Sequence, residues 1–262
     1  MMRFKVGSVP YVNAAPLTRW LESEAGARYA EVIYAPPSQL AQLLRAGALD
    51  VALVSSVEHF RRPETRYVPG LAIASRREVL SVRLFSQVPL AQVRTVALDT
   101  SSLTSAALTR ILLERAYRVR PTYIDAPPDL EAMLRSADAA LLIGDLGMTA
   151  SHPAVREVLD LGAAWHDWTG LPFVWALWLM NADAPVEAIS DLLYTAYEWS
   201  KQNLDAIIDA EAQRAGIPHE LCARYLREVM VYEIDETFLQ GLERFRAEVA
   251  RFFGSPHFVG GT

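Results

Sequence analysis

Hydroxyl side chains gather where a short apolar run gives way to an amphipathic segment. The richest group is the run of residues 100–105, in which five of the six residues carry a hydroxyl. Because capping a helix takes only one hydroxyl, this excess favours binding of an anion by hydroxyls and backbone N–H groups. The run lacks the glycines and the lysine of a P-loop. The residues that we expect to bind the anion are Ser101, Ser102, Thr104 and Ser105.

A second polar group lies in residues 7–17, directly after the first predicted strand. Two prolines and a glycine predict a tight turn from that strand into a helix. Asn13 either caps this helix or turns its amide toward a ligand, and the sequence leaves both roles open. Ser8 and Tyr11 belong to the same turn, and we predict that they contact the ligand.

Three further turns carry polar side chains beside apolar runs. Ser55 and Ser56 follow a strand that is predicted to be fully buried, where they either cap the next helix or hold a carboxylate. Asp145 follows another such strand and either caps a helix or orients a neighbour. Thr169 and Gly170 precede an apolar strand, and we predict that they present a hydroxyl and backbone N–H groups to a ligand.

The elements that must position these residues alternate between short apolar runs and amphipathic segments. This alternation is typical of an α/β protein built from β/α units around mostly parallel sheets. The predicted strands are residues 3–8, 30–34, 50–54, 71–74, 79–85, 95–98, 121–124, 139–143 and 173–180. Helices are expected at residues 13–22, 36–47, 102–116 and 220–229, and the chain from Pro185 onward is predicted to be wholly helical.

The order of these elements predicts two discontinuous lobes. Lobe I would comprise residues 1–86 and 183–262, including the helical tail, and lobe II residues 87–182. The tail would pack back on lobe I. This is the topology of the periplasmic-binding-protein-like type II fold, with a C-terminal helical segment and a ligand cleft between the lobes. Ser81, on the predicted strand 79–85, is expected to point into that cleft.

Composition and charge exclude several classes of protein. Hydrophobic residues make up 52% of the 262-residue chain and charged residues 21%, which is ordinary for a globular protein. The formal net charge of -6 argues against nucleic acid as a partner. The most apolar stretch, residues 171–180, is about half the length that spans a bilayer, so no membrane partner is expected.

Cysteine and motif usage predict a cytoplasmic protein without a cofactor. Cys222 is the single cysteine, which fits a reducing compartment and leaves no internal disulfide. We expect it to be a small core residue. The N-terminus shows no apolar region of the kind found in signal peptides. Neither metal-ligand spacing nor a dinucleotide-binding glycine motif is present, so we predict neither a metal nor a cofactor.

Taken in order, the polar clusters resemble those of the chorismate dehydratase family of the futalosine route to menaquinone. The matching segments are GSVPYVNAAPL (residues 7–17), DVALVSS (50–56), LDTSSLTS (98–105), IGD (143–145) and TGLPFV (169–174). Each segment alone is weak, but together they are fairly specific, and the helical tail also fits the family. Leu103 stands where the family often has Arg, so hydroxyls and N–H groups must bind the anion there.

The resemblance implies a periplasmic-binding-protein-like fold and an enzymatic function, the removal of water from chorismate to give 3-[(1-carboxyvinyl)oxy]benzoate. It implies an active-site asparagine at Asn13 and a cleft serine at Ser81. The hydroxyl clusters then become carboxylate holders, and the expected partner is a small-molecule dianion, chorismate. Losing the hydroxyl and a neighbouring C–H proton makes the ring aromatic, so the protein needs mainly to hold geometry and exclude water.

Two alternatives stay open. One is the sister enzyme of the same route, which releases 1,4-dihydroxy-6-naphthoate. Its N-terminal loop resembles Ser-Pro-Cys-Pro-Asn-Asp, whereas residues 8–13 here read Ser-Val-Pro-Tyr-Val-Asn, which counts against it. The other is a cytosolic protein that binds or senses a solute without catalysis.

Overall fold

A computed structural model describes residues 3–254, which form two compact units. Unit 1 contains the described residues up to Ala74 together with Val174–Asp235. Unit 2 contains Ser75–Phe173 and the residues from Glu236 onward. Residues 1–2 and 255–262 of the predicted lobe I lie outside the described residues. Each unit is an α/β structure around its own sheet.

The sheet of unit 1 is mixed, with β1 parallel to both β2 and β3, and β10 antiparallel to β3. Its strands, in spatial order, are β11 (Met230–Glu233), β4 (Arg66–Ser75), β10 (Phe173–Met180), β3 (Val51–Ser55), β1 (Phe4–Ser8) and β2 (Ala30–Tyr34). Every residue of β3 is buried, as expected for a strand covered on both faces.

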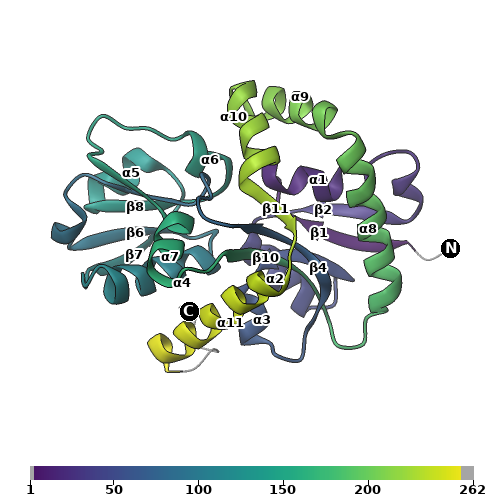
Figure 1. Cartoon of the computed structure of the whole chain (residues 1–262), viewed down its shortest axis with the longest axis horizontal. Coiled ribbons are helices and arrows are strands. Elements are labelled where there is room, and N and C mark those ends of the chain that lie inside the picture. Colours follow the sequence, from purple (N-terminus) through teal and green to yellow (C-terminus); the bar gives the residue numbers. More distant parts are fainter. Residues whose placement is uncertain (1–2, 255–262) are drawn as a thin grey trace. The chain divides into compact units, whose positions relative to one another are not determined.

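Helices of unit 1 cover this sheet and lie on either side of the turn after β1. They are η1 (Val12–Ala14), α1 (Ala15–Thr18), η2 (Gly26–Arg28), α2 (Pro37–Arg45), α3 (Val57–Arg61), α8 (Val186–Gln202), α9 (Leu204–Ala215), α10 (His219–Arg224) and η5 (Tyr225–Val229). The short helix α1 packs against α8 and α9, which lie beside it in Figure 1. The chain after β1 therefore packs against elements that come much later in the sequence.

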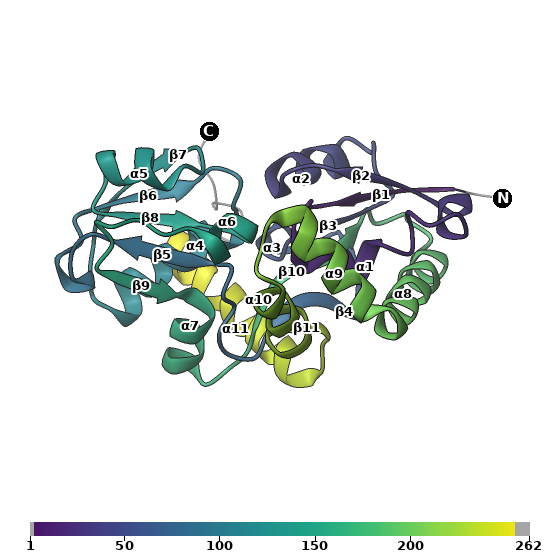
Figure 2. The same ribbon diagram turned by 90° about the horizontal axis from the view of Figure 1, so that it is seen from above.

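Unit 2 has a five-stranded mixed sheet, whose strands lie side by side in Figure 2. In spatial order they are β7 (Thr122–Ala126), β6 (Thr95–Asp99), β8 (Ala139–Leu142), β5 (Arg83–Ser86) and β9 (Glu157–Asp160). Its helices are η3 (Leu90–Gln92), α4 (Thr104–Ile111), η4 (Leu112–Ala116), α5 (Leu130–Ser136), α6 (Gly144–Thr149), α7 (Leu161–Thr169) and α11 (Glu236–Phe253).

The unit boundaries differ from those of the predicted lobes. The chain passes between the units after Ala74, Phe173 and Asp235, rather than near residues 85–90 and 181–185. Strand pairing gives the reason, because β5 is hydrogen-bonded between β8 and β9 in unit 2, whereas β10 is bonded to β3 in unit 1. Sequence periodicity reports the faces of a strand but not which neighbours it pairs with.

The last helix also belongs to a different unit from the one expected. The helix α11 has an apolar stripe with Phe238, Leu242, Phe245 and Val249 buried, but this stripe packs on unit 2. Phe245 meets the rings of Trp165 and Phe173 edge to face, with centroids 6.0 and 4.9 Å apart, and Arg76 stacks over Phe238. Such aromatic contacts stabilise the packing of the helix beyond what its buried apolar area alone provides.

Several predicted elements have different limits in the structure, and three of these differences bear on the site or the tail. The helix expected at residues 13–22 ends at Thr18, because the chain then folds into turns that bring Gly26 against the carbonyl of Trp20. The strand expected at 79–85 begins only at Arg83. The tail is not wholly helical, since the four-residue strand β11 pairs with β4. Four residues are too few for a strand's alternation of apolar and polar side chains to stand out between helical segments.

Gly241 allows α11 to approach the chain before β10, because a Cβ at this position would lie 2.2 Å from the Pro172 carbonyl oxygen. We expect Gly241→Ala to lower the free energy of unfolding by about 1–3 kcal/mol through overpacking, measured by urea denaturation. Gln240→Ala changes an exposed residue of the same helix and should stay within about 0.5 kcal/mol of wild type. Equal stabilities for the two variants would contradict this assignment.

Candidate active site

Two polar turns lie at one edge of the unit 1 sheet. The strands β1 and β3 are parallel neighbours, so their carboxyl ends meet at the same edge. Ser8 ends β1 and is buried, and Ser55 ends β3 with Ser56 beyond it, both also buried. Neither Asn13 nor Ser56 caps a helix through its side chain, which removes the alternative role considered for each.

Two tyrosines from the C-terminal half of unit 1 hold Asn13. The Asn13 amide Nδ2 donates to the hydroxyl oxygen of Tyr225 at 3.1 Å, and the Tyr232 hydroxyl donates to the backbone oxygen of Asn13 at 2.9 Å. Burial raises the pKa of Tyr232 well above its ordinary value, so this hydroxyl keeps its proton and remains a donor. The turn after β1 is thus fixed by both its side chain and its backbone.

This arrangement leaves one polar atom of Asn13 for a ligand. The amide oxygen Oδ1 is buried and has no hydrogen-bond partner within residues 3–254. A buried acceptor without a partner is costly, at about 1–3 kcal/mol. Since Tyr225 takes the Nδ2 donor, Asn13 presents a hydrogen-bond acceptor, and a ligand hydroxyl or N–H group would satisfy it.

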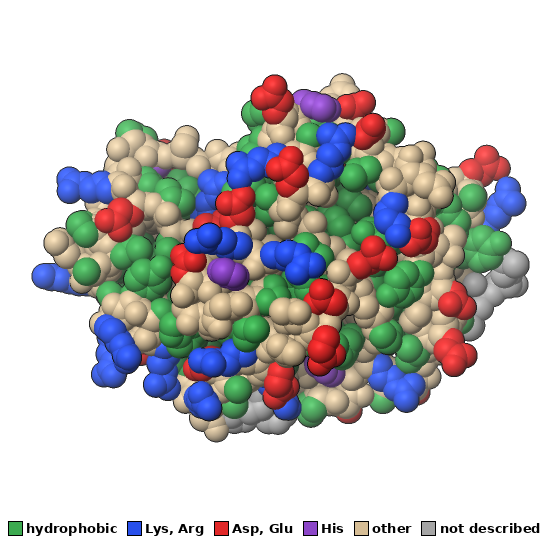
Figure 3. Space-filling view, in the orientation of Figure 1, with side chains coloured by type: hydrophobic (Ala, Val, Ile, Leu, Met, Phe, Trp, Pro, Cys, Tyr) green, Lys and Arg blue, Asp and Glu red, His purple; other side chains and the backbone are tan. Residues whose placement is uncertain are grey.

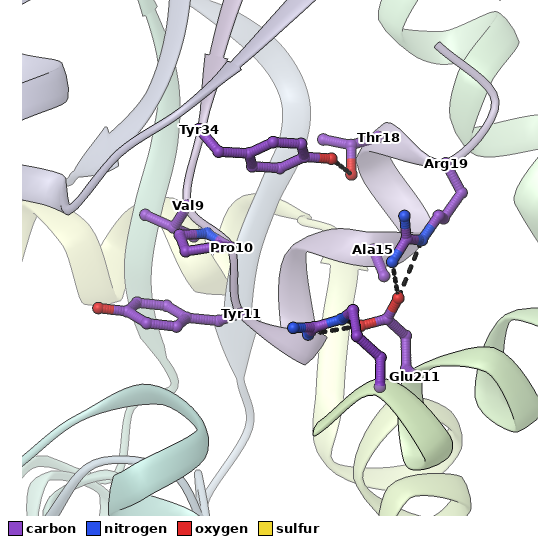
Figure 4. Close-up of a pocket in the computed structure, with 9 residues that line it drawn as sticks. Val9, Pro10, Tyr11, Ala15, Thr18, Arg19, Tyr34 and Glu211 are labelled. Atoms are coloured by element: carbon purple, nitrogen blue, oxygen red, sulfur yellow. Dashed lines mark hydrogen bonds and ion pairs between the residues drawn. The ribbon is translucent and has the colours of Figure 1, made fainter. Parts of the chain in front are cut away.

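Tyr11, on the same turn, lines a pocket of about 200 Å³ in unit 1. Figure 4 shows Tyr34 and Thr18 on one side of this pocket and Arg19 with Glu211 on another. The Tyr34 hydroxyl donates to Thr18 Oγ1 at 3.3 Å, and burial raises the pKa of Tyr34 to about 12. Tyr34 therefore stays neutral over the physiological pH range.

The charged wall of this pocket is internally neutralised. The buried carboxylate of Glu211 pairs with Arg19 on one side and with Arg214 on the other, where the Arg214 Nη2 lies 2.7 Å away. Arg19 also pairs with Glu22 at 2.9 Å. We read this network as the link between α1 and α9 and not as an anion site. Basic and acidic side chains are likewise interspersed over the face shown in Figure 3.

In unit 2, the hydroxyl run follows β6 and lies beside the turn after β8. These strands are parallel neighbours, so both turns share one edge of the sheet. Asp99 joins the two turns, because its carboxylate accepts from the N–H and hydroxyl of Ser101, at 2.8 and 2.6 Å, and from the backbone N–H of Ile143. Ser101 already uses both donors, so it must exchange partners to bind an anion.

The rest of the run enters the helix α4. Ser102 is buried before its start, and Thr104 and Ser105 form its buried first two residues. The helix begins after Leu103, and no side chain caps it. Its first N–H groups therefore lie beside three hydroxyl residues, which is the arrangement expected for anion binding at a helix N-terminus.

Ser81 and Asp145 lie with this group. Asp145 is in the first turn of α6, which follows β8, and it is half-buried. Gly147 of the same helix packs directly on Ser81, since a Cβ there would lie 2.2 Å from the Ser81 backbone oxygen. Ser81 is buried in a turn and not on a strand.

Thr169 and Gly170 precede the strand β10, as predicted, but their donors already have partners within unit 2. They end α7, and Gly170 takes the left-handed conformation of a helix C-cap. The Thr169 hydroxyl donates to the Trp165 carbonyl and accepts from Leu171 N–H, while Gly170 N–H donates to the His166 carbonyl. The role of these two residues in substrate binding stays a prediction.

Sequence reasoning missed the groups that hold these turns. Tyr225 and Tyr232 are 212 and 219 positions from Asn13, and no local pattern connects them. Asp160 precedes Leu161 as an N-cap residue should, and this signal could have located the start of α7. It would not have shown the second contact of Asp160, which is with the turn before Ser81.

Within the described part of the chain, no helix is both long and apolar enough to cross a membrane. The same residues contain no group of three or more His, Cys, Asp or Glu side chains that could hold a metal ion. Cys222 is buried in α10, as predicted for a core residue.

The fold places the chain in the class of periplasmic-binding-protein-like α/β proteins, as predicted. A protein of Archaeoglobus fulgidus covers 96% of this chain and 98% of its own with a TM-score of 0.77 and 18% identity. The periplasmic aliphatic sulphonate binding protein of Escherichia coli covers 99% of this chain and 95% of its own, with a TM-score of 0.65 and 15% identity. These likenesses establish the fold and leave the chemistry open.

Sequence comparison gives the family. A model described as "Menaquinone biosynthesis" matches residues 4–251. A chorismate dehydratase of Thermus thermophilus is 32% identical over 263 aligned residues, which cover 94% of each chain. The protein therefore belongs to the menaquinone biosynthesis family that contains chorismate dehydratases, and the predicted resemblance is confirmed.

The Asp99 carboxyl should make stability depend on pH. Burial raises its pKa above the ordinary 3.8, while hydrogen bonds from Ser101 oppose the shift. The folded state then holds the proton more tightly than the unfolded state, so this stabilisation is present below pH 3.8 and is lost as pH rises through the folded pKa. Urea denaturation from pH 4 to about 7 should show Asp99→Asn gaining stability relative to wild type. If Asp99→Asn instead lost stability relative to wild type as the pH rose, this account would be refuted.

Proposed function

We propose that this protein is a hydro-lyase that converts chorismate into 3-[(1-carboxyvinyl)oxy]benzoate and water. The observation that carries the proposal is the 32% identity to a chorismate dehydratase over 94% of each chain, within a menaquinone biosynthesis family. The substrate is a small molecule with two carboxylates. We place the reaction in the cytoplasm, because a chain with a single cysteine forms no internal disulfide and suits a reducing compartment.

In the proposed mechanism, Asn13 accepts a hydrogen bond from the ring hydroxyl of chorismate through Oδ1. This contact would give the buried oxygen the partner that it lacks among the described side chains and backbone groups. An amide is a poor base, so the substrate's own carboxylate takes the C–H proton next to the departing hydroxyl. The carboxylic acid formed in this way gives the proton to the departing hydroxyl, which leaves as water, and the ring becomes aromatic.

In this proposal, neutral hydrogen-bond donors bind the carboxylates of the substrate. The hydroxyls of Ser102, Thr104 and Ser105 lie at the start of α4, and they supply donors without an excess of fixed positive charge. Ser55 and Ser56 offer a second set of hydroxyls in unit 1. Ser81 is proposed to contact the reacting ring.

Turnover of chorismate tests the function. Purified protein should convert chorismate into an aromatic product that is followed by ultraviolet absorbance and identified by mass spectrometry. Binding of chorismate without any product would support a non-catalytic binding protein, a role suggested by the fold shared with a sulphonate binding protein. Release of 1,4-dihydroxy-6-naphthoate from its own substrate, without chorismate turnover, would support the sister enzyme.

Asn13→Ala should lower kcat by about 100-fold, because it removes the group that orients the departing hydroxyl. Steady-state kinetics with chorismate measure the effect. The matched control is Asn203→Ala, since the Asn203 amide bonds the Trp199 carbonyl at the end of α8. Turnover of Asn13→Ala within about threefold of the control would remove Asn13 from the mechanism.

Tyr225→Phe should lower kcat by about tenfold, because the Asn13 amide would lose the acceptor that fixes its orientation. The aromatic ring stays in place, so the buried core loses only a hydroxyl. Tyr194→Phe is the control, since the Tyr194 hydroxyl donates to the Pro69 carbonyl at 2.7 Å and not to Asn13. If both phenylalanine variants had the same kcat, the Tyr225 hydroxyl would have no part in orienting Asn13.

A further inference from the structure

The turn before Ser81 has a strained backbone. Leu80 has a φ of 60°, which L-residues other than glycine, asparagine and aspartate rarely adopt. The Ser81 N–H donates to the Val79 carbonyl at 2.7 Å, so these three residues form a γ-turn with positive φ, a rare and strained form. A non-glycine residue in this region costs about 1–3 kcal/mol and persists only where its surroundings enforce it.

A single carboxylate enforces this turn. Asp160 accepts from the backbone N–H groups of Val79, at 3.1 and 3.2 Å to its two oxygens, and Leu80, at 2.8 Å. The same carboxylate caps α7 by accepting from Gly162 and Ala163, each at 3.0 Å. Four N–H donors therefore converge on one side chain, and hydrogen bonds to an ionised acceptor are the strong ones.

Two glycines allow helices to pack closely on this turn. A Cβ on Gly162 would lie 2.3 Å from the Arg77 carbonyl oxygen, so α7 packs directly on the start of the turn. A Cβ on Gly147 would lie 2.2 Å from the Ser81 carbonyl oxygen, so α6 packs on its end. The Ser81 backbone is thus held between two helices, and Asp160 supplies the polar contacts.

We propose that Asp160 is a positioning residue for Ser81, acting by holding the strained turn at Leu80 against α7. This inference rests on the proposed function, in which Ser81 contacts the substrate. Without the carboxylate, the N–H groups of Val79 and Leu80 lose their acceptor, and the turn relaxes from its positive φ. Ser81 then moves, and a displacement of about 1 Å at a reacting group can cost up to about 100-fold in rate.

Asp160→Asn separates the two tasks of the carboxylate. Asparagine is as good an N-cap as aspartate, so its Oδ1 can still accept from the first turn of α7. Its Nδ2 is a donor and would face the N–H groups of the turn, which are donors as well. The variant should therefore keep the helix and release the turn.

Asp129→Asn is the matched control. Asp129 caps α5 in the same unit through a hydrogen bond from Ala132 N–H at 3.0 Å. We expect Asp160→Asn to lower kcat for chorismate by at least about tenfold while KM changes by less than about threefold. Asp129→Asn should leave both near wild type.

A double-mutant cycle with Ser81→Ala tests whether the effect passes through Ser81. If Asp160 acts by placing Ser81, Asp160→Asn should cost less than about threefold in kcat when Ser81 is already alanine. General damage to the unit would instead give the full tenfold loss in both backgrounds. That additive result would overturn the proposal.

Amide hydrogen exchange, read by mass spectrometry, tests the turn independently of activity. Peptides covering residues 77–82 should exchange at least about tenfold faster in Asp160→Asn than in wild type or Asp129→Asn. Unchanged exchange would overturn the proposal even if chorismate dehydration is confirmed. Absence of chorismate turnover by wild type would instead refute the proposed function, and the exchange result would still decide whether Asp160 holds the turn.

Discussion

Closely packed turns need partners for their backbone polar groups, and this requirement shapes both turns that carry the proposed catalytic residues. After β1, the carbonyl of Asn13 accepts from Tyr232. Before β5, the N–H groups of Val79 and Leu80 donate to Asp160. In each turn the partner is a side chain from a distant part of the chain, so the conformation of the turn depends on the completed fold.

The same requirement decides which polar atoms remain for a substrate. Tyr225 takes the amide nitrogen of Asn13, and Oδ1 is left as a buried acceptor without a partner in the described structure. Ser101, by contrast, donates both its hydroxyl and its backbone N–H to Asp99. The available groups are therefore set by internal hydrogen bonding and not by how many polar residues the turn contains.

Charge is used sparingly around these turns. Glu211 and Glu22 together balance the charges of Arg19 and Arg214 beside the turn after β1, so this network has no excess of positive charge. The start of α4 offers hydroxyls and N–H groups instead. A dehydration that is driven by aromatisation suits such a site, since it asks for orientation and exclusion of water more than for strong acids or bases.

Local pattern was enough for several elements because their side chains carry the information themselves. Residues 30–34 and 173–180 are strands with the predicted limits, and the apolar stripe of α11 is buried. Polar clusters after β1, β3, β6 and β8 were also visible in the sequence, since helix starts attract such residues. Family membership followed from the order of those clusters.

Only the tertiary structure decided which unit each element joins and how the turns are held. The positive φ at Leu80 turned part of a predicted strand into a γ-turn, and β11 appeared where helix was expected. Both outcomes depend on contacts between residues far apart in sequence. A local pattern reports the preference of a segment, whereas strand pairing and the hydrogen bonds of Asp160 exist only once distant segments have come together.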